Sequence, residues 1–217
     1  MDLLPLSLLG GLLALDATSV GQFMVSRPLV AGVLTGWIVG EPTVGLVIGA
    51  LLELYLLVSF PTGGSRFPEG PTATVVAVAA ASATNDPGAF PLAVAAGLVW
   101  GQLGGVTITW LRHLNGRLVP GPQTPTPDRV TRAHLEAVGL DFLRGTVITG
   151  LGIVAGRAAV RALAHAWPLD AGNTLGLLLA GGAVSAGILL RSLGGFRRRR
   201  LYFVAGVALG ILGARLL

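Results

Sequence analysis

The chain has no cysteine and no lysine, and few of its residues are charged or aromatic. The lack of cysteine excludes disulfides and thiolate metal sites. Only 12% of its 217 residues are charged, whereas soluble domains carry roughly 25%. Hydrophobic residues make up 53%, and the mean hydropathy is +0.76. A water-soluble core could not hide this much apolar sequence, so the composition predicts an integral membrane protein.

The sequence also lacks the motifs of catalysis and nucleotide binding. It contains no Walker loop and no His-Glu-x-x-His pair. His113, His134 and His165 are scattered, and a lone histidine is more often a surface or interfacial residue than a phosphoryl carrier. We therefore expect no catalytic residue, metal site or cofactor in this chain, and membership of an enzyme complex stays open.

All 15 basic residues are arginine, and the net charge is +5. An isoelectric point near 11.2 can indicate nucleic-acid binding, but these arginines lie beside apolar runs, so we expect no nucleic-acid partner. The segment Arg112–Arg144 holds five arginines, and another five lie between Arg191 and the end of the run Arg197–Arg200. Two predicted spans separate these patches, so both should face the cytoplasm, with Asp86 and Asp170 on the other side.

The N-terminal third reads as a series of short helices. Leu3–Leu15 and Leu29–Val39 are apolar, but each is shorter than the roughly 20 residues of a straight span. The first run starts after Asp2 without a basic n-region, so we expect mature sequence rather than a cleaved signal. Small residues spaced by four, as at Gly32, Gly36 and Gly40, let helices approach closely in lipid. They predict a packing face, and we expect a second membrane subunit to associate with the chain.

The segment Phe60–Pro71 interrupts the apolar sequence with three prolines and three glycines. Freed backbone groups facing lipid would cost several kcal/mol each, so such a break belongs at the membrane surface or around an enclosed polar cavity. A surface loop between two spans is one interpretation. Arg66 and Glu69, three residues apart and able to pair, favour the enclosed cavity, because intramembrane charges usually mark a substrate or ion path.

The later sequence has longer apolar runs. Phe90–Leu111 can span a bilayer, and a polar linker follows in which Asp128–Leu143 is amphipathic and is expected to form a surface helix. We therefore predict an all-α, polytopic integral membrane protein with short, discontinuous and re-entrant helices in its N-terminal half. Its single membrane unit, 1–217, would comprise an N-terminal half (1–111) with the binding site, a cytoplasmic linker (112–144) and C-terminal spans (145–217).

Polar residues gather near the predicted breaks in the N-terminal half. Discontinuous helices with charges near their breaks are how many secondary transporters build a site at mid-depth. Carboxylates, amides and hydroxyls hold sugar hydroxyls, and the same groups could bind a cation or a proton. For Glu53, a purely structural hydrogen bond between helices is the alternative. The candidate substrate-binding residues, expected to face one cavity, are Asp16, Thr18, Gln22, Glu53, Ser65, Arg66 and Glu69.

Two motifs in this region carry a family resemblance. The stretch Leu15-Asp-Ala-Thr-Ser-Val-Gly-Gln-Phe-Met-Val-Ser-Arg-Pro-Leu-Val-Ala-Gly32, with Pro61-Thr-Gly-Gly-Ser-Arg-Phe-Pro-Glu69, resembles the membrane subunit IIC of mannose/fructose/sorbose-family sugar phosphotransferase systems. The strong match covers about residues 10–85. Where the family usually has aspartate the chain has Glu69, and Arg66 replaces a small residue; either change could shift the substrate.

The resemblance implies a subunit of the bacterial inner membrane that binds and translocates a hexose-type sugar. It implies a IID membrane partner, and a cytoplasmic IIB/IIA phosphocarrier that would phosphorylate the sugar, in a complex expected to be a homo-oligomer in the lipid bilayer. Two alternatives stay open. One is a non-transporting regulatory or assembly subunit that kept the scaffold, and the other is an ion-coupled secondary transporter.

Overall fold

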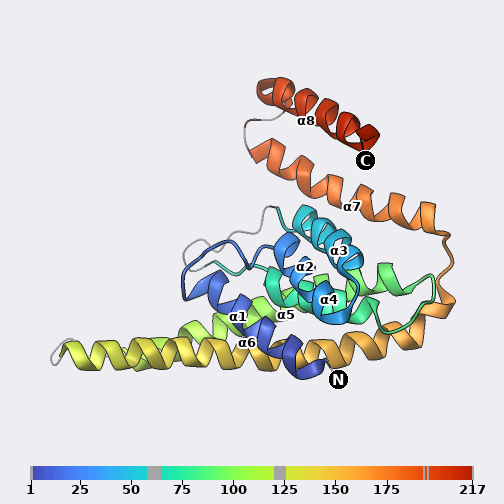
Figure 1. Ribbon diagram of the computed structural model, residues 1–217. Coiled ribbons are helices and arrows are strands. Elements are labelled where there is room, and N and C mark those ends of the chain that lie inside the picture. The colour runs from blue at the N-terminus through green and yellow to red at the C-terminus, as the bar shows by residue number, and fades with distance from the viewer. Residues whose placement is uncertain (1, 58–64, 120–125, 193, 195, 217) are drawn as a thin grey trace.

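The computed structural model describes residues 2–57, 65–119, 126–192, 194 and 196–216, and this described part contains helices and no strand. Figure 1 shows the helices in chain order from blue to red. The all-α prediction is confirmed. The elements are α1 (Leu3–Thr18), α2 (Pro28–Val39), α3 (Pro42–Tyr55), α4 (Gly70–Ala81), α5 (Ala89–Leu118), α6 (Pro127–Leu163), the 3-10 helix η1 (Ala164–Ala166), α7 (Ala171–Ser192) and α8 (Phe196–Leu216).

The prediction of short helices in the N-terminal half is confirmed as well. The helices α1 to α4 have 16, 12, 14 and 12 residues, fewer than the roughly 20 needed to cross a bilayer. Three described helices are long and apolar enough to span a membrane, and they correspond to α5, α6 with η1, and α7. The molecule therefore combines short helices with full spans.

Helix α4 forms the centre of the bundle. Every residue from Pro71 to Ala81 is buried, which suits a sequence of alanine, valine and threonine with no polar face. Helices α1, α2, α3, α5 and α6 all pack against it (Figure 1). The start of α4 is therefore held deep inside the protein, and Glu69, which directly precedes α4, is buried as well.

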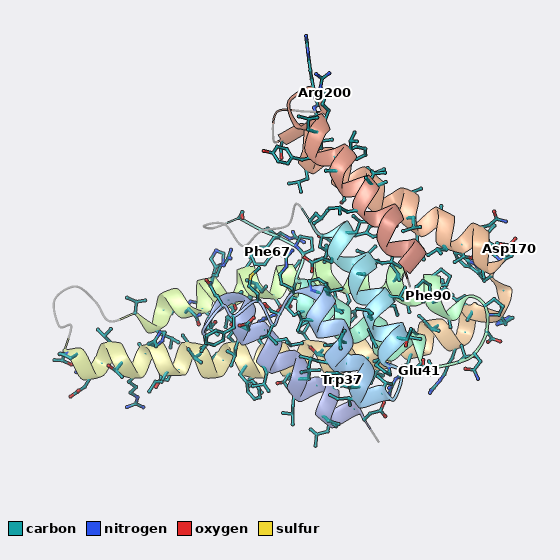
Figure 2. The ribbon with its side chains drawn as sticks, turned by 45° about the horizontal axis from the view of Figure 1, so that its top comes forward. Trp37, Glu41, Phe67, Phe90, Asp170 and Arg200 are labelled. Atoms are coloured by element: carbon teal, nitrogen blue, oxygen red, sulfur yellow. The ribbon has the colours of Figure 1, made fainter. Side chains whose placement is uncertain are left out.

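Helices α2 and α3 form a tight hairpin through glycine. A Cβ atom at Gly32 or Gly45 would overlap a backbone atom of the opposite helix, so the predicted glycine face packs inside the chain. Gly40 is different: it ends α2 with a left-handed φ of 87°, and a Cβ atom there would meet nothing within 4 Å. Trp37 and Glu41 lie at this exposed turn (Figure 2).

The predicted polar linker is largely helical. Helix α5 continues to Leu118, and α6 is one helix that joins the predicted surface helix Asp128–Leu143 to the first part, through Leu163, of the predicted C-terminal spans (145–217). Sequence reasoning separated the two because charged residues interrupt the apolar pattern. The charges at Asp141 and Arg144 are buried and paired inside the bundle, so the helix passes through them. The two polar helix ends lie side by side beyond the bundle, at the left of Figure 1.

Helix α7 packs on α3 at the edge of the bundle, and α8 follows beyond it (Figure 1). Asp170 begins α7, where its carboxylate accepts a hydrogen bond from the backbone N–H of Asn173 at 2.8 Å. This bond favours the ionised form and lowers the pKa of the Asp170 carboxyl. Both helices expose many apolar side chains, including Leu177, Val184 and Tyr202, as expected of helices that face lipid.

Candidate functional site

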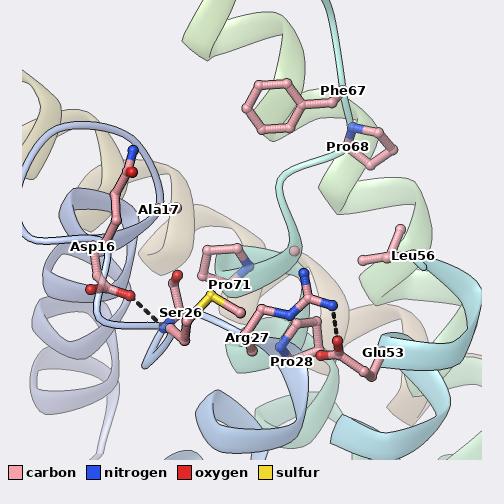
Figure 3. A pocket seen from close by; sticks show the side chains of 13 residues that line it. Asp16, Ala17, Ser26, Arg27, Pro28, Glu53, Leu56, Phe67, Pro68 and Pro71 are labelled. Atoms are coloured by element: carbon pink, nitrogen blue, oxygen red, sulfur yellow. Dashed lines mark hydrogen bonds and ion pairs between the residues drawn. The ribbon is translucent and has the colours of Figure 1, made fainter. Parts of the chain in front are cut away.

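A pocket of about 270 Å³ lies where the short helices break. It is bounded by the loop after α1, the start of α2, the end of α3 and the segment before α4 (Figure 3). Its polar side and its apolar wall together suit a small ligand that carries both hydroxyl groups and C–H surface. The polar side chains used below are Asp16, Gln22, Arg27 and Glu53, and the apolar wall includes Leu56, Phe67 and Pro68.

Asp16 holds the loop that forms one side of the pocket. Its Oδ1 accepts a hydrogen bond from the backbone N–H of Phe23 at 2.6 Å. Its Oδ2 accepts one from the backbone N–H of Ser26 at 2.8 Å (Figure 3). On either side of Phe23, Gln22 and Met24 have left-handed φ values of 53° and 67°. Such conformations cost of order 1–3 kcal/mol each and persist where the surroundings enforce them. The Asp16 carboxylate thus fixes the loop that presents Gln22.

Glu53 and Arg27 form an ion pair across the pocket (Figure 3). Their side chains are 21% and 29% exposed, and the second carboxylate oxygen accepts a weak hydrogen bond from the backbone N–H of Leu29 at 3.4 Å. Neither group is sealed away, so both retain hydrogen-bonding capacity toward a ligand. Arg27, which directly precedes α2, lines the pocket but is not among the site residues that the sequence predicts.

The break before α4 is only partly described, because residues 60–64 of the predicted segment Phe60–Pro71 lie outside the described residues. Ser65 and Arg66 are exposed and do not line the pocket. The backbone carbonyl of Ser65 accepts a hydrogen bond from Arg112 Nη1 at 2.9 Å. The Arg112 guanidinium also lies 5.5 Å from the centre of the Phe67 ring, close enough for a cation–π contact. Arg112 thus fastens this segment to α5.

Glu69 lies outside the pocket, fully buried. Arg144 donates to both of its carboxylate oxygens, at 2.7 and 2.9 Å, and Thr72 donates to one at 3.0 Å. The predicted pairing with Arg66 is therefore wrong. The true partner is 75 residues away on α6, and only the tertiary fold brings the two together.

Arg144 also serves a second buried carboxylate. Asp141 Oδ1 accepts hydrogen bonds from Arg144 Nε and Nη2 at 3.1 and 2.9 Å. Asp141 Oδ2 accepts hydrogen bonds from Thr18, at 2.6 Å, and from Ser19. Buried charges are tolerated when paired and fully hydrogen-bonded. This buried network, Thr18–Ser19–Asp141–Arg144–Glu69, joins the end of α1 to the start of α4 through α6.

The structure brings only some of the predicted site residues together. Asp16, Gln22 and Glu53 line the pocket, whereas Thr18 lines a neighbouring pocket with Gln22. Ser65, Arg66 and Glu69 line neither, so the expectation of one shared cavity for all seven residues is wrong. Within the described part of the chain no group of histidine and carboxylate side chains has the arrangement of a metal site. What the pocket offers is hydrogen bonding to a polar ligand.

Comparison with known proteins gives this pocket its context. A family model described as the PTS system sorbose-specific IIC component matches residues 2–212. The chain belongs to this family. It is therefore a membrane transport component of the sugar phosphotransferase system. A search of curated protein sequences found no match.

Two solved structures have a fold similar to that of this IIC component. One, described as a membrane protein, is 16% identical with a TM-score of 0.71, and the alignment covers 99% of this chain and 91% of that one. The other is a complex of the mannose transporter ManYZ with a microcin. It is 18% identical with a TM-score of 0.52, and the alignment covers 99% of this chain and 90% of that one. At these identities the likeness concerns the fold.

Proposed function

We propose that this IIC component binds and translocates a hexose-type sugar, which a partner IIB subunit phosphorylates. The observation that carries the proposal is the pocket formed by Gln22, Arg27 and Glu53 against an apolar wall. Its volume of about 270 Å³ lies just below the roughly 300–1,000 Å³ of drug-sized ligand sites and suits one small molecule. A sugar hydroxyl both donates and accepts, so it can bond to an amide, a guanidinium and a carboxylate at once.

The partners follow from the same assignment. The solved mannose transporter ManYZ supports pairing of this chain with a IID subunit in the membrane. Cytoplasmic IIB and IIA subunits would supply the phosphoryl group, since we expect no phosphoryl carrier in this chain. We also propose a homo-oligomeric complex in the cell's inner membrane, with Arg112–Arg144 and Arg197–Arg200 facing the cytoplasm.

Equilibrium binding to the protein in lipid nanodiscs tests the sugar site. D-Mannose, D-fructose and L-sorbose serve as probes for the parent and for Glu53→Gln, which keeps the side-chain shape and removes the charge. Loss of a charge-assisted hydrogen bond costs about 1.5–3 kcal/mol, so affinity should fall roughly ten- to a hundred-fold. The matched control is Glu41→Gln, an exposed carboxylate at the α2–α3 turn, which should bind like the parent. Equal affinity of Glu53→Gln and the parent would place the sugar elsewhere.

A further inference from the structure

A second polar pocket lies beside the first. It also measures about 270 Å³ and is formed by the end of α1 with the polar parts of α5 and α6. Unlike the first pocket, it has a lining made mainly of polar groups. These are Thr18, Ser19, Gln22, Arg112, Asn115 and Asp141.

The two pockets are neighbours that share a wall. Ala17 and Gln22 line both of them. Arg112, which lines the second pocket, packs over the ring of Phe67, which lines the first. The partition thus consists of the loop after α1 together with the Arg112–Phe67 contact. Gln22, held in a left-handed conformation, can present its amide to a ligand in either pocket.

The polar groups of the second pocket select the kind of ligand. The Oδ1 atom of Asn115 is buried and has no hydrogen-bond partner among the described residues. Leaving such an acceptor unsatisfied costs about 1–3 kcal/mol, so a ligand that donates a hydrogen bond is favoured. Asp141 shares its arginine with Glu69, which places two carboxylates on one guanidinium. A phosphate, which is anionic and mainly accepts hydrogen bonds, would meet an unsatisfied acceptor and the Asp141 carboxylate here.

A simple cation is disfavoured in the same pocket, because the positive charge of Arg112 in the lining would repel it. A neutral polyhydroxyl ligand meets neither objection. Its hydroxyls can donate to Asn115 Oδ1 and accept from the Arg112 guanidinium.

We propose that this second pocket is a second binding site for the same sugar, which we call the second station. The sugar would enter it from the first pocket past Gln22. The sugar would occupy it between the first pocket and the end of the molecule where the polar ends of α5 and α6 extend. This inference rests on the proposed function and adds a residue set, centred on Asn115, to the sugar path.

Single cysteines test the station directly, because the chain has none of its own. Ser26→Cys reports on the first pocket, Asn115→Cys on the second, and His113→Cys, an exposed site on the same helix, is the matched control. A small thiol reagent is applied with and without D-mannose, D-fructose or L-sorbose, and with glycine betaine as an osmotic control. At a sugar concentration ten times the dissociation constant of a pocket, about nine-tenths of the molecules have that pocket filled. The rate of thiol modification at Ser26→Cys and at Asn115→Cys should then fall roughly tenfold. His113→Cys should react unchanged.

The outcomes separate this inference from the proposed function. Protection of Ser26→Cys without protection of Asn115→Cys would leave the sugar site standing and overturn the second station. An Asn115→Cys thiol that never reacts would overturn it too, because the pocket would then be closed. Protection of neither cysteine would count against the proposed function itself.

A second variant covers the case in which Asn115→Cys folds poorly. Asn115→Leu removes the amide and keeps the branched shape of the side chain, and His113→Leu is its control. Asn115→Leu should keep parental affinity at the first pocket and slow sugar uptake about two- to tenfold, the equivalent of one hydrogen bond. Uptake by Asn115→Leu equal to that by His113→Leu would contradict the second station.

Discussion

At the scale of single residues, the buried network around Arg144 changes the roles first assigned to the carboxylates. Glu69 is fully buried and both its oxygens are occupied by Arg144, so it positions the start of α4. Glu53 keeps one side open to the pocket. Burial, which no residue type reveals by itself, separates a positioning carboxylate from one that can meet a ligand.

Glu69→Ala should strongly destabilise the fold. Removing one member of a buried ion pair leaves an uncompensated charge and costs about 3–5 kcal/mol. Thermal unfolding in detergent should show a fall in Tm of at least about 6 °C. The control is Glu136→Ala, which breaks an exposed pair with Arg132, 2.9 Å long, and should cost less than about 1 kcal/mol. Similar Tm values for the two variants would refute the positioning role of Glu69.

Asp16→Asn should loosen the loop after α1. The amide replaces an acceptor oxygen with an NH₂ group that would face a backbone N–H, so one of the two bonds to Phe23 and Ser26 is lost. A hydrogen bond to a charged group is worth about 1.5–3 kcal/mol. Hydrogen exchange should therefore rise across residues 20–26, while Glu53→Gln should leave that loop protected. Unchanged exchange in Asp16→Asn would show that the carboxylate does not hold the loop.

At the scale of helices, close approach through glycine positions the segment before α4. A Cβ atom at Gly105 would overlap the backbone carbonyl oxygen of Phe67. Nearby, the backbone N–H of Glu69 donates a hydrogen bond to the carbonyl of Gly101 at 2.8 Å. Small residues on α5 thus set the depth at which Phe67 and Glu69 lie.

Gly105→Ala should therefore destabilise the protein, whereas Gly116→Ala in the same helix should not. Forcing extra volume into a packed contact costs about 1–3 kcal/mol. A Cβ atom at Gly116 would meet nothing within 4 Å, and alanine there should stabilise the helix by up to about 1 kcal/mol. Thermal unfolding of both variants in one detergent checks the contrast. A Tm for Gly105→Ala at or above that of Gly116→Ala would contradict the packing argument.

Much of the element order follows from the sequence, because proline and glycine mark the breaks. Helix α2 differs from the predicted run Leu29–Val39 only by including Pro28. Prediction failed at α6, where buried charges at Asp141 and Arg144 looked like a polar boundary. It also failed at the partner of Glu69. Both failures have one physical cause: a charge that is paired across the fold is compatible with burial, and the pairing joins residues far apart in sequence.

At the scale of the whole molecule, the arginine-rich segments lie toward one end. The polar ends of α5 and α6 project to the left in Figure 1, and the C-terminal end of α7 points the same way. Figure 2 shows Asp170 beside the start of α7 and Arg200 near the start of α8. Arg157 lies near the C-terminal end of α6 and pairs with Asp2 at 2.7 Å. The hydrogen bond from Arg157 lowers the pKa of the Asp2 carboxyl to about 2.

Cysteine labelling tests the proposed orientation. Arg117→Cys and Arg197→Cys should resist an impermeant thiol reagent in intact cells or spheroplasts and react after lysis, because arginine-rich segments stay cytoplasmic. Asn85→Cys, in the exposed turn before α5, should react without lysis. The reverse pattern would invert the topology.

The central claim is that this IIC component carries a sugar through the membrane for phosphorylation. The most direct measurement follows radiolabelled D-mannose, D-fructose and L-sorbose into cells that express the chain with IID, IIB and IIA subunits. One sugar should accumulate as its phosphate ester, and Glu53→Gln should reduce this accumulation at limiting sugar. Accumulation of free sugar that an ionophore abolishes would instead identify an ion-coupled transporter. No uptake, despite a correctly assembled complex, would identify a non-transporting subunit and contradict the account.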